Sequence, residues 1–208
     1  RYRESAVFAW IPTMTSISRQ AIFSGKPPYH FPETLLSTDH DEKQWIRFWQ
    51  NENLSSTQIG YLRGLGNAGM ERVEDAIDSP GVQVIGLVVG AAGMASQTKM
   101  WAGKPFMLNL LDSLLIQGFR VFLTSDHGNI ETKGVGRPGE GSIAELRGER
   151  VRIFSDSGLR SRVREQFPES VEWPSDGLPD GCLPLLAPPG GAFVTPSAKT
   201  VCHGGGSI

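Results

Sequence analysis

The sequence has only two cysteines, Cys182 and Cys202, in 208 residues. Two thiols are too few for the disulfide framework of a small secreted protein, and although they can pair, a reducing cytoplasm is the simpler assumption. An uninterrupted run of about eighteen apolar residues is also missing, which argues against a membrane span. The first residues, RYRESAVFAW, are charged and are not followed by a cleavage site, so they do not resemble a signal peptide. We therefore expect a cytoplasmic protein with no membrane partner.

A large net charge is absent too. The chain carries 20 Lys and Arg against 22 Asp and Glu, a formal net charge of −2. This balance gives no global attraction to nucleic acid, although a local basic patch is still open. Apolar residues make up 39% of the chain, which indicates a packed core rather than disorder.

The length is sufficient for one sizeable domain, with or without a subdomain. The first residue is Arg1 rather than Met, and the last residues, HGGGSI, do not form a recognisable closing element. We expect a single domain over residues 1–208 that is a fragment of a longer chain, truncated at both ends.

Near the start, AVFAWIP (6–12) predicts a buried strand, because the residue before a proline is disfavoured in a helix. The next segment, TMTSISRQAIFSG (13–25), predicts a helix with a Thr or Ser N-cap and with Gly25 just past its end. A hydroxyl at a helix N-terminus faces the N–H groups that attract anions, and a neighbouring metal ion would lower its pKa. The alternative is a polar surface turn. Four hydroxyl side chains are candidate nucleophiles: Thr13, Thr15, Ser16 and Ser18.

The clearest pattern lies between residues 82 and 129. VQVIGLVV (82–89) predicts a strand buried on both faces, and RVFLTSDHGN (120–129) predicts a second buried strand with its exit loop. Between them we expect a helix that ends before Gly118. Its predicted core face consists of Met107, Leu108, Leu110, Leu111, Leu114 and Leu115. Strand, helix and strand with continuous apolar runs indicate a parallel α/β sheet, in which sites form at the carboxyl ends of the strands.

Further helices are expected over 41–50, 70–78 and 159–167, and further strands over 57–65 and 149–155. We interpret His40 as a solvated helix cap and His30 as a loop residue. The glycine-rich GVGRPGEG (134–141) predicts a flexible flap, from which Arg137 could reach a phosphate.

TSDHGN lies at the predicted carboxyl end of a buried strand. Adjacent Asp126 and His127 can face one point only if the backbone bends sharply, and Gly128 permits that bend. Carboxylate and imidazole form a normal ligand pair for Zn²⁺ or Mn²⁺, whereas the alternative is a turn that merely caps the loop. His203, in VCHGGG, follows a short apolar segment in the same way. Alone it would be an ordinary histidine, but beside SDHGN it becomes a candidate ligand.

Taken together, PTMTSISRQAIFSG, LTSDHGNIE and HGG resemble the PglZ domain of the alkaline phosphatase superfamily, a component of BREX-type phage defence systems. The resemblance runs over nearly the whole length. It implies an α/β fold with an alkaline-phosphatase-like core, in which a mostly parallel central sheet is flanked by helices. It also implies a metal-dependent phosphoryl hydrolase, phosphodiesterase or nuclease-like, that acts on a phosphate ester. Nucleic acid and nucleotides are candidate substrates, and other BREX proteins are the implied partners.

The resemblance also selects residues. Thr15 matches the nucleophile, because it is the second Thr of PTMT and precedes Gly25 by the family's interval. Asp126 and His127 match the pair that holds the metal ion bound to the nucleophile, and His203 matches the late histidine of a second site. Two divalent ions, Zn or Mn, are implied. Arg19, one helical turn after Thr15, is expected either to support the phosphate or to form a salt bridge outward.

Two departures from the family pattern stand out. The superfamily has an early Asp ligand that this chain lacks, and it has an Asp and a His after the strand that corresponds to VQVIGLVV. Here GAAGMASQ (90–97) follows directly, so we expect an insertion to be missing after Val89. The competing interpretation is a catalytically degenerate domain that acts as a scaffold or interaction module.

Overall fold

The computed structural model describes residues 3–65, 69–90, 105–143 and 149–204, and the chain divides into two compact units. One unit comprises residues 39–124, and the other comprises residues 1–38 together with 125–208. The mixed α/β class predicted from the sequence is confirmed. The structure does not test the insertion expected to be missing after Val89, since the segment after Gly90, residues 91–104, lies outside the described residues. The single domain over 1–208 stays a prediction.

The unit of residues 39–124 is built on a parallel pair of strands, β1 (Ile59–Leu65) and β2 (Val84–Val89). Ile59 lies opposite Val84 and Leu62 opposite Leu87. The helix α3 (Met70–Ile77) connects the two strands. Parallel neighbours need such a crossover. This strand–helix–strand unit is not the one predicted over residues 82–129, because the second strand of that prediction is absent and β2 pairs with β1 instead.

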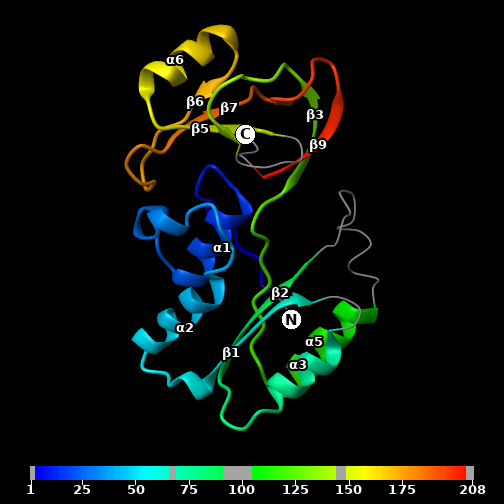
Figure 1. Ribbon diagram of the computed structural model, residues 1–208. Coiled ribbons are helices and arrows are strands. Elements are labelled where there is room, and N and C mark those ends of the chain that lie inside the picture. Colours follow the sequence, from blue (N-terminus) through cyan, green and yellow to red (C-terminus); the bar gives the residue numbers. More distant parts are fainter. Residues whose placement is uncertain (1–2, 66–68, 91–104, 144–148, 205–208) are drawn as a thin grey trace. The chain divides into compact units, whose positions relative to one another are not determined.

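Among the described residues this unit has two more helices, α2 (Asp41–Asn51) and α5 (Pro105–Ile116), so both predicted helices are confirmed (Figure 1). His40 is the N-cap of α2, as expected, although its side chain makes no capping hydrogen bond. The core between helices and strands is apolar and consists of Leu65, Val73, Ile77, Phe106, Met107, Leu110 and Leu114.

The predicted core face of α5 is partly wrong. Met107, Leu110 and Leu114 are buried, but Leu108 and Leu115 are exposed. Positions 107, 110 and 114 share one helix face, whereas 108 and 115 lie together on the neighbouring face, since two positions seven apart nearly superimpose. The buried face of α5 is therefore narrower than the apolar composition of the helix indicates.

Helix α2 packs on the strand pair through Trp45. Its indole Nε1 donates a hydrogen bond to the Gly60 carbonyl at 2.8 Å. A Cβ added at Gly86 would lie only 3.0 Å from the indole ring. The indole thus fits on the strand pair because β2 carries no side chain at that position.

The other unit contains two sheets. In the first, β3 (Asn129–Gly134) lies between β8 (Gly191–Ala192), its parallel neighbour, and β9 (Lys199–His203), its antiparallel neighbour. The second is antiparallel and has the order β4-β5-β7-β6. Its members are β4 (Ser142–Ile143), β5 (Val151–Phe154), β7 (Leu183–Leu186) and β6 (Val171–Glu172). The flap predicted over 134–141 thus starts from a strand and leads into another.

Two helices belong to this unit, α1 (Thr15–Ser24) and α6 (Ser157–Gln166), and both were predicted. Short 3-10 helices follow α1 at Pro28–His30 and at Pro32–Thr34. His30, which was predicted to be a loop residue, therefore ends a 3-10 helix. Figure 1 shows α6 beside the β5–β7 sheet, and its Val163 packs there with Phe154 and Leu185. A separate cluster around Met14, Ile17 and Leu186 anchors α1.

The predicted strands over 6–12 and 120–124 are wrong: neither segment is a strand. Phe8 is fully exposed and Phe122 is 84% exposed. A strand exists only where a neighbour completes its hydrogen bonds, and no described strand pairs with either segment. Apolar composition alone therefore predicted elements that lack a partner.

Both cysteines are free thiols and both are buried. None of the helices in the described ranges is long and apolar enough to cross a membrane.

Candidate functional site

The candidate nucleophile lies at the first turn of α1. The helix begins at Thr15 and ends at Ser24, and Gly25 follows in the left-handed conformation with φ of 63°, as predicted. The predicted Thr or Ser N-cap is wrong, because the N-cap is Met14 and no side chain caps the helix. Met14 and Ile17 are buried in the core, so packing rather than capping fixes this helix start. The hydroxyl of Thr15 is thereby available for a different contact.

That contact is with His127. The Thr15 Oγ1 lies 2.8 Å from His127 Nε2, at hydrogen-bond distance, although 112 positions separate the two residues in the chain. Both residues belong to the same compact unit. Thr15 and His127 are therefore brought together as the sequence led us to expect, on the segments predicted to carry them.

The other candidate hydroxyls have different surroundings. Ser16 and Ser18 are buried, with 7% and 6% of their surface exposed, and they flank the core residue Ile17 on either side of the helix. Thr13 precedes the helix and is half-buried. Thr15 is thus a hydroxyl for which the structure gives a direct contact with His127.

Asp126 and His127 form the second part of the site. The Asp126 Oδ1 accepts a hydrogen bond from the His127 backbone N–H at 3.0 Å, and its Oδ2 lies 3.8 Å from His127 Nε2. The carboxylate therefore bends back beside the imidazole, as the predicted sharp turn requires. The His127 side chain is 10% exposed and that of Asp126 is 31% exposed.

A third segment reaches the site through its backbone. Asn129 of β3 lies opposite His203 of β9, and the N–H of Gly204 donates to the Gly128 carbonyl at 3.0 Å. Gly204 has φ of 60°, and a Cβ placed on it would lie 2.0 Å from the Thr13 carbonyl oxygen. The sequence motif HGG is thus adjacent to the Thr15–His127 pair.

His203 is placed only in part. Its backbone ends β9 next to the site, which agrees with its predicted position after a short strand. Its side chain is outside what the structure describes, so its role as a metal ligand stays a prediction. Gly204 was not recognised from the sequence as a site residue, although the glycines after His203 were the signal that could have identified it.

The two candidate arginines are less closely tied to the pair. Arg19 is half-buried on α1, one turn after Thr15, and its phosphate role stays a prediction. Arg137 is exposed, and it lies close enough to Glu149 to affect that carboxyl. Burial raises the pKa of Glu149, while the Arg152 guanidinium and Arg137 oppose this shift. The structure thus associates Arg137 with a neighbouring carboxylate.

Two donor atoms lie near His127 Nε2: Thr15 Oγ1 at 2.8 Å and Asp126 Oδ2 at 3.8 Å. One hydroxyl oxygen, one imidazole nitrogen and one carboxylate oxygen are a donor set that suits Zn²⁺ or Mn²⁺. In the described part of the chain no cluster of three His, Cys, Asp or Glu side chains can hold a metal ion. A metal site here would therefore need Thr15 as a donor beside Asp126 and His127.

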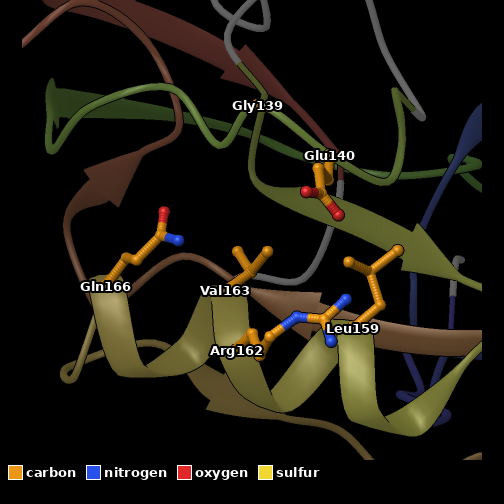
Figure 2. A pocket seen from close by; sticks show the side chains of 6 residues that line it. All are labelled: Gly139, Glu140, Leu159, Arg162, Val163 and Gln166. Atoms are coloured by element: carbon orange, nitrogen blue, oxygen red, sulfur yellow. The ribbon is translucent and has the colours of Figure 1, made fainter.

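A separate cavity of about 240 Å³ lies against α6. Figure 2 shows Arg162 and Gln166 of this helix, and Glu140 of the segment 134–141, along the wall of the cavity. None of the residues predicted for the site lines this cavity. It is consequently not the place where Thr15 and His127 meet.

Comparison with protein families identifies this chain's relationship. A family model described as "BREX system PglZ alkaline phosphatase-like domain" matches residues 1–208, the whole chain. No curated protein matches the sequence significantly.

Proposed function

Because the chain belongs to the family of PglZ alkaline phosphatase-like domains of BREX systems, we propose that it is a metal-dependent phosphoryl hydrolase, most specifically a phosphodiesterase. The observation that carries this proposal is the 2.8 Å contact between Thr15 Oγ1 and His127 Nε2. A hydroxyl within hydrogen-bond distance of an imidazole, at the start of a helix, is the arrangement of an activated nucleophile.

The family likeness supports an alkaline-phosphatase-like core over residues 1–208 with a mostly parallel central sheet, and the parallel β1–β2 pair agrees with it. The family likeness also supports the proposal that this chain acts together with other BREX proteins. The nearly balanced charge favours a small phosphate ester or nucleotide over a long duplex, because a duplex is bound mainly through many phosphate contacts.

Thr15, Asp126 and His127 would hold one divalent ion, and His203 would contribute to a second. Such ions lower the pKa of a bound hydroxyl and neutralise charge that develops on the phosphoryl group. The remaining chemistry belongs to residues of the chain. Asp126 supplies negative charge, and the α1 N-terminus directs backbone N–H groups toward an anion.

In the reaction, Thr15 Oγ attacks phosphorus and the bond between phosphorus and the leaving alkoxide breaks. The hydroxyl proton of Thr15 ends on the departing alcohol, so the first product is a phosphorylated Thr15 and a free alcohol. Water then attacks the same phosphorus, which releases the phosphomonoester and restores the hydroxyl. Arg19, on the same face of α1, is proposed to neutralise a phosphoryl oxygen during both steps.

The test is hydrolysis of bis-p-nitrophenyl phosphate by EDTA-treated protein to which Zn²⁺ or Mn²⁺ is returned. We expect metal-dependent turnover that falls on the order of 10³-fold in Thr15→Ala, because the attacking oxygen is lost. Thr57→Ala is the matched control, since it deletes the same atoms at an exposed position of the other unit. Turnover in the control should equal that of the unmodified protein.

Two results would oppose the proposal. Turnover that survives in Thr15→Ala would exclude Thr15 as the nucleophile. A well-folded protein that binds neither metal and hydrolyses no phosphate ester would favour the alternative, a PglZ domain that serves as a scaffold or interaction module.

A further inference from the structure

The carbonyl oxygen of Gly128 accepts two hydrogen bonds at the centre of the site. One comes from the Gly204 N–H at 3.0 Å, and the other joins it to His127 Nδ1 at 3.0 Å. A carbonyl oxygen has two lone pairs and no hydrogen, so it can accept both bonds and donate neither. The backbone of three chain segments, around residues 13, 128 and 204, thus meets beside one imidazole.

This arrangement determines which ring nitrogen of His127 is protonated. Since Gly128 can only accept, Nδ1 must carry the hydrogen of the neutral ring, and Nε2 must present its lone pair. The Thr15 hydroxyl, 2.8 Å from Nε2, is then the donor of their hydrogen bond. The same lone pair is the one that a divalent ion requires.

Gly204 is held at this place from both sides. A Cβ on residue 204 would lie 2.0 Å from the Thr13 carbonyl oxygen and 3.2 Å from His127 Cγ. Its φ of 60° is also a conformation that residues with a side chain rarely adopt. Only glycine can therefore bring its N–H to the Gly128 carbonyl while it contacts both the ring and the segment that leads into Thr15.

We infer that Gly204 is a positioning residue for the phosphoryl transfer proposed above. Its N–H fixes the Gly128 carbonyl, and that carbonyl fixes the orientation and tautomer of His127, so that Nε2 faces Thr15. Gly204 acts through His127 and makes no contact with a reacting atom. The inference rests on the proposed function for its catalytic consequence, but the tautomer itself does not depend on that function.

The first experiment is ¹⁵N NMR of histidine-labelled, EDTA-treated protein at a pH where the rings are neutral. The chain has four histidines, so their signals can be assigned by substitution. We expect His127 to be in the Nδ1–H tautomer. Thr15→Val should leave this tautomer unchanged, because Gly128 rather than Thr15 selects it. A His127 ring protonated on Nε2, or a tautomer that changes in Thr15→Val, would overturn the inference without any other variant.

The second experiment compares Gly204→Ala with Gly139→Ala. Both variants add one methyl group, but a Cβ at Gly139, in the same compact unit and outside the site, would meet no atom within 4 Å, so its substitution is the matched control. We expect Gly204→Ala to mix the two tautomers and to lower kcat about 10- to 100-fold, with a smaller change in KM, as loss of the group that orients a catalytic histidine does. Gly139→Ala should retain the tautomer and kcat.

The outcomes separate the two proposals. An Nδ1–H ring in a protein without phosphoesterase activity would remove the proposed function and leave the positioning geometry intact. Full activity and an unchanged tautomer in a folded Gly204→Ala would remove the positioning role and leave the proposed function. If Gly204→Ala does not fold, the tautomer measurements on the unmodified protein and on Thr15→Val decide.

Discussion

The hydroxyl side chains at the start of α1 differ in their surroundings more than in their residue type. Thr15, Ser16 and Ser18 all carry hydroxyls on the first turn of α1, but Ser16 and Ser18 are buried while Thr15 is half-buried and contacts His127. The sequence predicted that this helix would meet the Asp126-His127 loop, because the motifs resemble those of a family. It did not reveal Gly204, since a backbone N–H leaves no signature in residue type beyond the glycine itself.

The negative charge of Asp126 can be tested separately from its hydrogen bond. Asp126→Asn keeps an oxygen that can accept from the His127 N–H, so the turn should persist, but the anionic donor near Nε2 is lost. We expect Zn²⁺ affinity to fall about 10- to 100-fold. Isothermal titration of EDTA-treated protein measures it. Asp180→Asn, at an exposed position of the same unit, is the control, and equal affinity in the two variants would show that Asp126 is not a ligand.

Helices and strands were predictable to different degrees. The helix α1 and its end at Gly25 followed from local signals, since helical hydrogen bonds join residues four apart. The predicted strands over 6–12 and 120–124 failed because a strand depends on a neighbour elsewhere in the chain. The pairing of β3 with β9, which delivers Gly204 to the site, was likewise not visible in the sequence, although the short strand before His203 was.

The attachment of α1 to the next segment depends on Gln20, which is fully buried. Its Nε2 donates to the carbonyls of Thr34 and Ser37 at 2.7 and 3.0 Å, and its Oε1 accepts from the Thr34 hydroxyl at 2.7 Å. Gln20→Ala removes these bonds and leaves a void, so we expect a loss of about 2–4 kcal/mol in the free energy of unfolding. Urea unfolding followed by circular dichroism measures this loss.

The matched control is Gln50→Ala, which makes the same change on an exposed face of α2. It should alter the free energy of unfolding by no more than about 0.5 kcal/mol. Equal effects of the two substitutions would show that the buried amide of Gln20 does not anchor α1.

At the scale of the whole molecule, each compact unit has an apolar core of its own, and the two cysteines lie in the unit that carries the site. Cys182 packs in the cluster that anchors α1, and the Cys202 thiol lies 3.0 Å from the Thr132 hydroxyl. Burial raises the pKa of both thiols, although Thr132 and Arg150 oppose the shift at Cys202. Both side chains therefore favour the neutral thiol in the folded chain.

Alkylation with iodoacetamide tests this state, because the thiolate is the reactive form. At mildly alkaline pH we expect both cysteines to react on the order of a hundredfold more slowly in the folded protein than in urea. A raised pKa stabilises the fold at pH values below the ordinary thiol pKa, and this contribution is lost as the pH rises above it. Rapid labelling of Cys182 in the folded protein would contradict its burial.

The hydrogen bond from the Gly204 N–H to the Gly128 carbonyl determines when the site can form during protein synthesis. Thr15 leaves the ribosome early and His127 much later, but the Gly128 carbonyl acquires its partner only after residue 204 has emerged and β9 has paired with β3. A nascent chain that already contains both Thr15 and His127 would thus lack the contact that orients the ring. The proposed hydrolase would therefore gain the fixed orientation of His127, and with it full activity, only after residue 204 has been translated.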